Sequence, residues 1–416
     1  MSTPLIESPC EEICSIDDAL QGWRVPHWRP ATFIPIFDPV TQYYGAYVFN
    51  VQYFLANTPQ IREIVMGSLQ SHSACRKVVE ILSELHSGRK RLPQRTDGIP
   101  LILRYLKHTG TGNLDDAMAV LHAVSAYLFN GGDGAWEECI DFAARHVDIV
   151  LSTTFFCDAS PLQFCDEKTA FIVKTAIWFD VLASITSQKP PRLCPVIDRL
   201  FSPSRTHIED LGDPLSNQCS MLSPMGCEND VVWALSEISA LAEWKREQES
   251  QGRLSFPELV AKGKTLEQFL DNPRCLQPCR DDPTAILHYN TANIFRAAAH
   301  LYLAVVISGD HPLVREVACA TQKTYSAITA IHRDAMQPVV RSTVFAFFLC
   351  GCFLVNRVQQ DYIKDLLLYQ EQSTEIGNCR SIVDLLETIW RMKSSPEDPR
   401  PVPWQTLLRE KHILLV

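Results

Sequence analysis

The sequence lacks the short motifs that identify most enzymes and nucleotide-binding proteins. It contains no glycine-rich phosphate loop, no HExxH, no GxSxG and no pair of CxxC motifs. Its histidines are scattered singly, and none stands near a cysteine or serine in a recognised nucleophile arrangement. The sequence therefore favours a protein that is not an enzyme and assigns a catalytic role to no residue; a triad assembled by folding stays open.

Positive charge is also scarce. The chain has 38 Lys and Arg residues against 48 Asp and Glu residues, a formal net charge of -10 at pH 7. Such a balance repels a phosphate backbone unless the basic groups gather on one face, so we expect no direct DNA binding by this chain. The densest basic stretch is GRKRLPQR, which is either a nuclear-import signal or a solvated loop; its basic residues are Arg89, Lys90, Arg91 and Arg95.

Long apolar runs and a secretory signal are missing as well. The longest apolar run, Val344 to Val355, is shorter than the roughly 20 residues that a helix needs to cross a bilayer, so it predicts a buried core helix. The segment MSTPLIESPCEEIC is acidic rather than basic and then apolar. The fifteen cysteines are accordingly predicted to be reduced thiols in the nucleus or cytosol, and no membrane association is expected.

Metal-binding patterns are weak. The cysteine pairs Cys10/Cys14 and Cys275/Cys279 each lack a second matching pair or a nearby histidine pair. The segment NDVVWALSE places Asn229, Asp230 and Glu237 at the spacing of the second magnesium motif of terpene cyclases. Its middle ligand position holds Trp233, and an indole cannot coordinate a hard cation. We therefore expect no metal and no cofactor, and we interpret Asn229 and Asp230 as residues that cap the start of a helix.

What the sequence does contain is helical periodicity. From Tyr43 onward, apolar residues recur three and four positions apart, and strand-like alternation is rare. In residues 114–129, Asn113 is placed to cap the first turn, and Asp115 and Asp116 favour its positive end. The same pattern predicts helices over 135–151, 168–186, 231–246, 291–307, 313–331, 342–368 and 380–392.

These helices predict an all-α fold, a large irregular multi-helix domain of antiparallel helix pairs. Residues 1–42 are predicted to be an acidic, proline-containing lead-in, and residues 43–416 to be the helical domain. We expect long loops over 187–224 and 272–283, and no fixed repeat is visible. Alanines 297–299 allow close helix approach, and Arg296 is predicted to pair with a carboxylate of a neighbouring helix. The apolar segment after Trp404 should fold back onto the core.

Several segments in order resemble the fungal-specific transcription factor regulatory domain, which follows the binuclear zinc cluster in regulators of fungal metabolism. The segments are IPLILRYLKHTGTG, KTAIWFDVLASITSQKPPRL, MGCENDVVWALSEISALAEWK, TANIFRAAAHLYL, SIVDLLETIWRMK and PVPWQTLLREKHILL. The resemblance implies a helical scaffold without a catalytic site, a role in transcription, and a location in the nucleus and cytoplasm. It also implies protein partners (a second copy, a related zinc-cluster regulator or the transcription machinery) and a small-molecule effector whose binding residues are unknown.

The sequence departs from that family in one respect. Members that bind DNA carry six cysteines in about thirty residues ahead of this domain, whereas only Cys10 and Cys14 precede Cys75 here. We therefore expect either a missing upstream exon or a regulator that acts without its own zinc cluster. Two alternatives stay open: an interaction protein that dimerises with related regulators and titrates them, and a helical enzyme of secondary metabolism.

Overall fold

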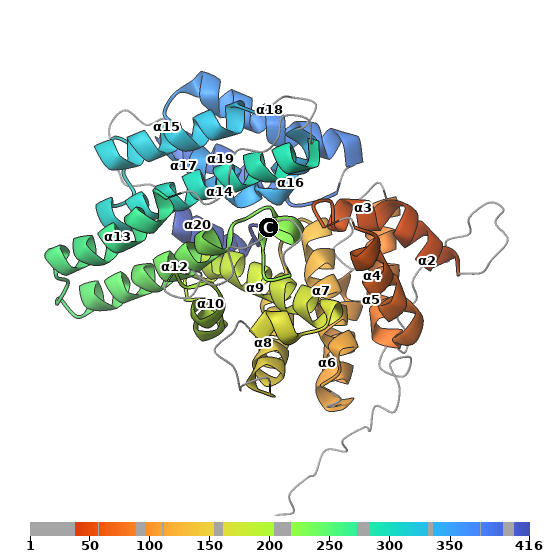
Figure 1. Ribbon diagram of the computed structural model, residues 1–416. Coiled ribbons are helices and arrows are strands. Elements are labelled where there is room, and N and C mark those ends of the chain that lie inside the picture. Colours follow the sequence, from red (N-terminus) through yellow and green to blue (C-terminus); the bar gives the residue numbers. More distant parts are fainter. Residues whose placement is uncertain are drawn as a thin grey trace, which may run out of the picture.

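The computed structural model describes residues 38–56, 58–88, 96–109, 112–153, 161–203, 218–272, 283–331, 336–374, 376–393 and 403–416. Every regular element in these ranges is a helix, and they contain no strand (Figure 1). The predicted all-α fold is therefore confirmed.

The helices follow one another from the N-terminal to the C-terminal part of the described chain. They are α2 (Pro39–Tyr43), the π-helical turn η1 (Tyr44–Val48), α3 (Phe49–Gln52), α4 (Pro59–Ser71), α5 (Ser73–Ser87), α6 (Gly98–Thr109), α7 (Leu114–Phe129), α8 (Trp136–Thr153), the 3₁₀ turn η3 (Pro161–Phe164), α9 (Glu167–Ser187), α10 (Cys194–Phe201), α11 (Leu222–Met225), α12 (Asn229–Ser250), α13 (Phe256–Leu270), α14 (Pro283–Ser308), α15 (Arg315–Thr329), α16 (Met336–Ser342), α17 (Val344–Phe353), α18 (Arg357–Thr374), α19 (Cys379–Lys393) and α20 (Trp404–Lys411).

Helix starts follow the capping residues that the sequence offers. Asn113 forms a capping box on α7: its side chain accepts a hydrogen bond from the Asp115 amide at 3.1 Å, and Asp116 accepts one from the Asn113 amide at 3.4 Å. Asp38 caps α2 with its side chain, which accepts hydrogen bonds from the amides of Val40 and Thr41. Among the described residues the first helix therefore begins at Pro39, four residues before Tyr43, where the helical periodicity was predicted to begin.

The prediction of one helix over residues 342–368 is wrong. α17 ends at Phe353, and Leu354 takes an extended conformation with ψ 130°. The Asn356 side chain then accepts a hydrogen bond from the Val358 amide at 2.9 Å, so it begins a new helix, α18. An asparagine between two apolar stretches was the signal for this break.

The predicted loop over 187–224 is also partly wrong, because it contains α10 and α11. α11 ends at Met225, and the next residue, Gly226, has a φ of +68°. A Cβ atom at this position would lie 2.7 Å from side-chain atoms of both Leu55 and Thr291. Only glycine accommodates this backbone conformation together with such a close approach.

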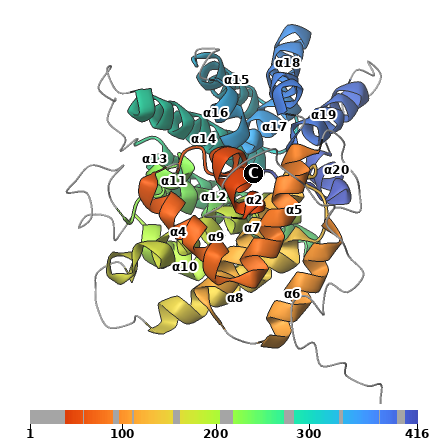
Figure 2. The same ribbon diagram turned by 90° about the vertical axis from the view of Figure 1, so that its right-hand side faces the viewer.

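The helices form two groups that meet at the centre of the molecule. α2 to α8 lie on one side, α14 to α19 lie on the other, and α12 and α13 project as a hairpin (Figure 1). α9 packs against α7, α8 and α12, while α14 packs against α12, α13, α15 and α17. The C-terminal end lies in the middle of the molecule in both views (Figure 2).

One cluster of buried hydrophobic side chains runs from Tyr44 to Leu415. The helix Glu167–Ser187 and the segment Thr284–Ser308 are long and apolar enough to cross a membrane, by length and composition alone. Their apolar windows are 100% and 67% buried inside the protein, so both serve as core helices here. Thr324 of α15 donates a hydrogen bond to the Ala297 carbonyl at 3.1 Å, which confirms the close helix approach expected at alanines 297–299.

We expect the described helices to unfold as one unit, because the buried cluster joins both groups without interruption. Thermal unfolding followed by far-ultraviolet circular dichroism and by tryptophan fluorescence should then give coincident transitions. Two separate transitions, or a spectrum dominated by strand signal, would contradict this expectation.

Candidate functional site

A cavity of about 150 Å³ lies where the two groups of helices meet. Its walls come from seven parts of the chain that are far apart in sequence. The lining residues are Val51–Leu55, Ser125, Leu128, Phe129, Thr175, Trp178, Phe179, Pro224, Met225, Arg341, Ser342, Val344, Ile376, Gly377, Asn378, Cys379 and Val416. A hollow with mostly apolar walls and a few polar groups is the usual form of a small-molecule site.

On the side of α3, the wall is built around the Gln52 side chain. Its Oε1 accepts a hydrogen bond from the Tyr44 hydroxyl at 2.6 Å. Its Nε2 lies 2.9 Å from Ser125 Oγ, 3.0 Å from His122 Nδ1 and 3.2 Å from the Tyr53 hydroxyl. Tyr44 is the first residue of the π-helical turn η1, which leads directly into α3, and such turns often mark functional positions. This network fixes the orientation of Gln52 beside the cavity.

His122 belongs to this network and is fully buried. Burial lowers its pKa from 6.5 to about 3, so the imidazole is neutral at physiological pH. Its Nε2 atom has no hydrogen-bond partner in the described part of the chain. A neutral, buried histidine keeps charge away from this wall.

His122 should make the protein sensitive to acid. The folded state holds the imidazole neutral, whereas the unfolded state binds a proton below about pH 6.5, so stability falls as the pH falls towards 3. Between pH 6.5 and pH 5 this group should remove about 2 kcal/mol from the free energy of unfolding. Urea unfolding at the two pH values should show that His122→Asn loses less free energy of unfolding than the wild type.

The matched control is the same substitution at the exposed His108. His108→Asn should leave the loss of stability between the two pH values unchanged. An equal loss in wild type and His122→Asn would show that His122 is not the source.

On the opposite side, the wall is formed by the end of α16 and the start of α19. Arg341 and Ser342 come from α16, and Gly377, Asn378 and Cys379 lead into α19. Burial lowers the pKa of the Arg341 guanidinium, and the nearby Cys379 thiol acts in the opposite direction. The charge of Arg341 also contributes to lowering the pKa of His86, after the larger effect of burial.

The C-terminal segment closes a third side and is bound from both groups of helices. Trp136 Nε1 donates to the His412 carbonyl at 3.0 Å, and Thr186 Oγ1 donates to the Ile413 carbonyl at 2.8 Å. Asn378 Nδ2 donates to oxygens of Leu414 and Val416 at 2.8 and 3.2 Å. Val416, which lines the cavity, is thereby held in place.

The predicted pairing of Arg296 is confirmed. Its Nε donates to Glu228 Oε2 at 3.0 Å, its Nη2 lies 3.1 Å from Asp230 Oδ2, and its Nη1 donates to the Leu270 carbonyl at 2.9 Å. Arg296, Glu228 and Asp230 are all buried. The cluster lies where α14 crosses the start of α12.

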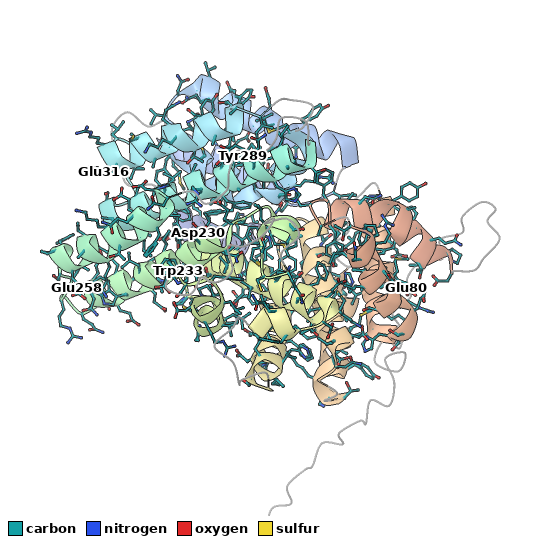
Figure 3. The ribbon with its side chains drawn as sticks, viewed as in Figure 1. Glu80, Asp230, Trp233, Glu258, Tyr289 and Glu316 are labelled. Atoms are coloured by element: carbon teal, nitrogen blue, oxygen red, sulfur yellow. The ribbon has the colours of Figure 1, made fainter. Side chains whose placement is uncertain are left out.

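The capping role predicted for Asn229 and Asp230 is confirmed only in part: α12 begins at Asn229, and Asp230 Oδ1 accepts a hydrogen bond from the Val231 amide at 3.0 Å, but the Asn229 side chain does not cap the helix. Asn229 instead binds the segment before α11, accepting from the Met221 amide and donating to the Cys219 carbonyl. Asp230 faces Arg296, and Trp233 donates to Asp198 at 3.2 Å. Asp230 and Trp233 lie in the first turns of α12 near the centre of the molecule (Figure 3). An aspartate paired with arginine is not placed as a magnesium ligand.

The remaining candidate residues for a metal or catalytic site do not come together in the described part of the chain. Among the residues that the structure describes, no group of three or more His, Cys, Asp or Glu side chains could hold a metal ion. His72 pairs with Asp116 at 3.0 Å, and His288 contacts the carbonyls of Thr284 and Ser223. Outside the described residues lie Cys10, Cys14, Cys275, Cys279, Arg89, Lys90, Arg91 and Arg95.

Sequence reasoning missed the cavity altogether. Its polar residues, such as Gln52, Ser125 and Arg341, each stand alone in a helical segment and form no motif. One available signal was a lysine and a threonine, Lys174 and Thr175, inside the otherwise apolar stretch 170–179 of α9. Thr175 lines the cavity, and the neighbouring Lys174 donates to the Gln218 and Ser220 carbonyls.

Curated relatives of this chain are fungal transcription regulators. The trichothecene biosynthesis transcription regulator TRI10 of Trichoderma arundinaceum is 25% identical over 185 residues, 44% of this chain and 42% of that protein. The ustiloxin B cluster transcription factor ustR of Aspergillus flavus is 25% identical over 255 residues, 58% of this chain and 41% of that protein. The match therefore covers about two fifths of the length of these relatives.

No solved structure matches the chain significantly. The match to a family covers more of the chain than the matches to single relatives. Residues 40–416 match the family described as the fungal specific transcription factor domain, which covers all the helices from η1 to α20. The chain therefore belongs to the fungal specific transcription factor domain family, a family of fungal transcription regulators.

Proposed function

We propose that residues 40–416 act as the effector-sensing part of a transcription regulator of fungal secondary metabolism. The observation that carries this proposal is the cavity between the two groups of helices. A small molecule bound there touches α3, α9, α16 and α19 at once, so its affinity depends on how these helices sit together. A ligand that binds one arrangement better than another shifts the population towards it. We further propose that the protein acts in the nucleus for at least part of the time.

A transcription reporter tests the regulatory role. Residues 40–416 are fused to a heterologous DNA-binding domain, and the reporter carries that domain's site in a filamentous fungal host. We expect transcription to differ from that with the DNA-binding domain alone, in either direction. Equal transcription under all growth conditions that induce secondary metabolism would contradict the proposed function.

DNA recognition is assigned to another segment or protein in this proposal. The formal net charge of -10 disfavours contact with phosphates. We expect the purified chain to bind duplex DNA only at non-specific levels, with a Kd of roughly 10⁻⁴ to 10⁻⁶ M at physiological salt. Fluorescence anisotropy with labelled promoter fragments measures this. Sequence-specific binding at nanomolar concentrations would contradict it.

The alternative role, a dimerising protein that titrates related zinc-cluster regulators, is favoured by one surface feature. Val358, Tyr362 and Tyr369 follow one face of α18 and are 75%, 37% and 51% exposed. Sedimentation distinguishes the two roles. A chain that is a dimer, and becomes a monomer after Tyr362→Glu, would support titration; a monomer would favour effector sensing by the single chain.

A further inference from the structure

The polar side chains that α3, α7 and α9 contribute to the cavity are already bonded within the protein. Gln52 Oε1 accepts a hydrogen bond from the Tyr44 hydroxyl, and Gln52 Nε2 lies 2.9 Å from Ser125 Oγ. Thr175 Oγ1 donates to the Phe171 carbonyl at 2.8 Å. A ligand that bonds to one of these groups replaces a bond that already exists, so it gains little affinity there.

The opposite wall is bonded in the same way. Asn378 Nδ2 donates to oxygens of Leu414 and Val416, at 2.8 and 3.2 Å. Arg341 also has an interaction within the protein, so its guanidinium is not a vacant anion site. An anionic ligand would lose its hydration here without gaining an unengaged cation, which disfavours its binding.

A cationic ligand is disfavoured as well. None of the described residues that line the cavity is an aspartate or glutamate, so no carboxylate there balances a positive charge. Arg341 places a like charge on one wall. The walls therefore favour an uncharged ligand.

The rest of the lining is apolar and aromatic. Tyr53, Phe129 and Trp178 belong to this part, together with Leu128 and Val344. A cavity of about 150 Å³ is large enough for a single six-membered ring, since dry cavities of about that volume bind benzene. It is smaller than the roughly 300 to 1,000 Å³ typical of sites for drug-sized ligands.

One polar group of the lining, the indole N–H of Trp178, differs from the others. Buried tryptophans usually find a hydrogen-bond acceptor. Trp136, Trp233, Trp390 and Trp404 each donate to an oxygen of the protein, at 3.0, 3.2, 2.8 and 3.4 Å. Trp178 is only 5% exposed, but its Nε1 donates to no acceptor in the described part of the chain. Because Trp178 lines the cavity, a ligand there can supply the acceptor.

From these walls we infer that the ligand of the cavity is an uncharged molecule with one aromatic ring and one hydrogen-bond acceptor, such as an aryl ketone. Its ring lies against Tyr53 and Phe129, and its acceptor binds Trp178 Nε1. This assignment rests on the proposed function, because it names the class of effector for the same cavity.

Isothermal titration calorimetry of the full chain tests the assignment with four probes of similar size. Acetophenone is uncharged and has a carbonyl acceptor, whereas ethylbenzene is uncharged and has none. Benzoate is an anion and benzylammonium is a cation. We expect both charged probes to bind at least about 10-fold more weakly than acetophenone.

Substitution of Trp178 tests the hydrogen bond. Trp178→Phe keeps an aromatic ring and removes the N–H, so it should weaken acetophenone binding by about 4- to 10-fold. Ethylbenzene has no acceptor, so its affinity should stay within about twofold of wild type and controls for the change in cavity shape. The matched control is Trp244→Phe, because Trp244 packs under Lys262 and does not line the cavity; it should change neither affinity.

A further variant shows that the probes bind in this cavity. Thr175→Leu narrows it and should weaken the binding of both uncharged probes. The melting temperature of each variant shows whether it is folded. Unchanged binding of acetophenone and ethylbenzene in folded Thr175→Leu would place them elsewhere and overturn the assignment.

Three other outcomes overturn the assignment. One is that benzoate or benzylammonium binds as tightly as acetophenone, and another is that Trp178→Phe affects acetophenone and ethylbenzene equally. If Thr175→Leu still blocks binding in these two cases, effector sensing stands and only the ligand class is wrong. The third is absence of binding by all four probes; the reporter then tests effector sensing separately.

Discussion

Replacing Arg296 with methionine should destabilise the protein by about 3 to 5 kcal/mol, the largest effect that we expect from a single charged residue. The guanidinium is buried between Glu228 and Asp230 and also donates to the Leu270 carbonyl. Its removal leaves the Glu228 and Asp230 carboxylates buried side by side without the cation that binds both of them. Guanidinium chloride unfolding measures the loss as a lower midpoint at an unchanged slope.

Two further variants show whether the loss of stability arises from the two carboxylates that lose the Arg296 guanidinium. The triple variant Arg296→Met, Glu228→Gln, Asp230→Asn removes all three charges and should recover most of the lost stability. Arg315→Met, at an exposed position, should cost less than about 0.5 kcal/mol. If the triple variant is as unstable as Arg296→Met, lost packing rather than charge explains the effect.

Truncating Trp404 to alanine should cost about 3 to 5 kcal/mol. The indole is completely buried, and its ring centroid lies 6.4 Å from that of Tyr302, 6.1 Å from Phe348 and 6.5 Å from Phe353. Its Nε1 donates to Asp310 Oδ1 at 3.4 Å. Alanine would leave a large cavity between α14, α17 and the C-terminal segment. The loss of stability is measured as a lower midpoint of thermal or denaturant unfolding.

The matched control is Phe256→Ala, because Phe256 is 66% exposed at the start of α13. It should cost less than about 1 kcal/mol. Truncation of the chain after Met392 removes Trp404 together with the tail that Trp136, Thr186 and Asn378 bind, so its loss should exceed that of Trp404→Ala. A truncated protein with unchanged solubility and melting temperature would contradict the role given to the tail.

Much of the fold could be predicted because it depends on local patterns. The capping box at Asn113 sets the start of α7, and an apolar stripe sets most of the helix bodies. The burial of Trp404 could also be predicted, since an apolar segment after a proline-rich break has to fold back. The split between α17 and α18 was missed because the apolar period runs through it, and the signal lies in Asn356 alone.

The candidate site could not be predicted, because its residues acquire their meaning from folding. Gln52, Thr175, Arg341 and Val416 line one cavity, although hundreds of residues separate the first from the last. The sequence predicted that Arg296 forms an ion pair, but it did not identify the partners. An arginine beside three alanines in an apolar helix requires a buried partner, but nothing in the sequence identified Glu228 and Asp230 as that partner, and Asp230 was interpreted as a helix cap.

The central claim is that the cavity controls the transcriptional output of this domain. The most direct test compares two threonine-to-leucine variants in the tethered reporter. Thr175 lines the cavity and Thr329 is exposed on α15, and both hydroxyls bond a carbonyl four residues earlier, at 2.8 and 3.1 Å. We expect Thr175→Leu to remove the response of the reporter to growth conditions that induce secondary metabolism, and Thr329→Leu to keep it. A response that survives in folded Thr175→Leu at the wild-type level would contradict control through this cavity.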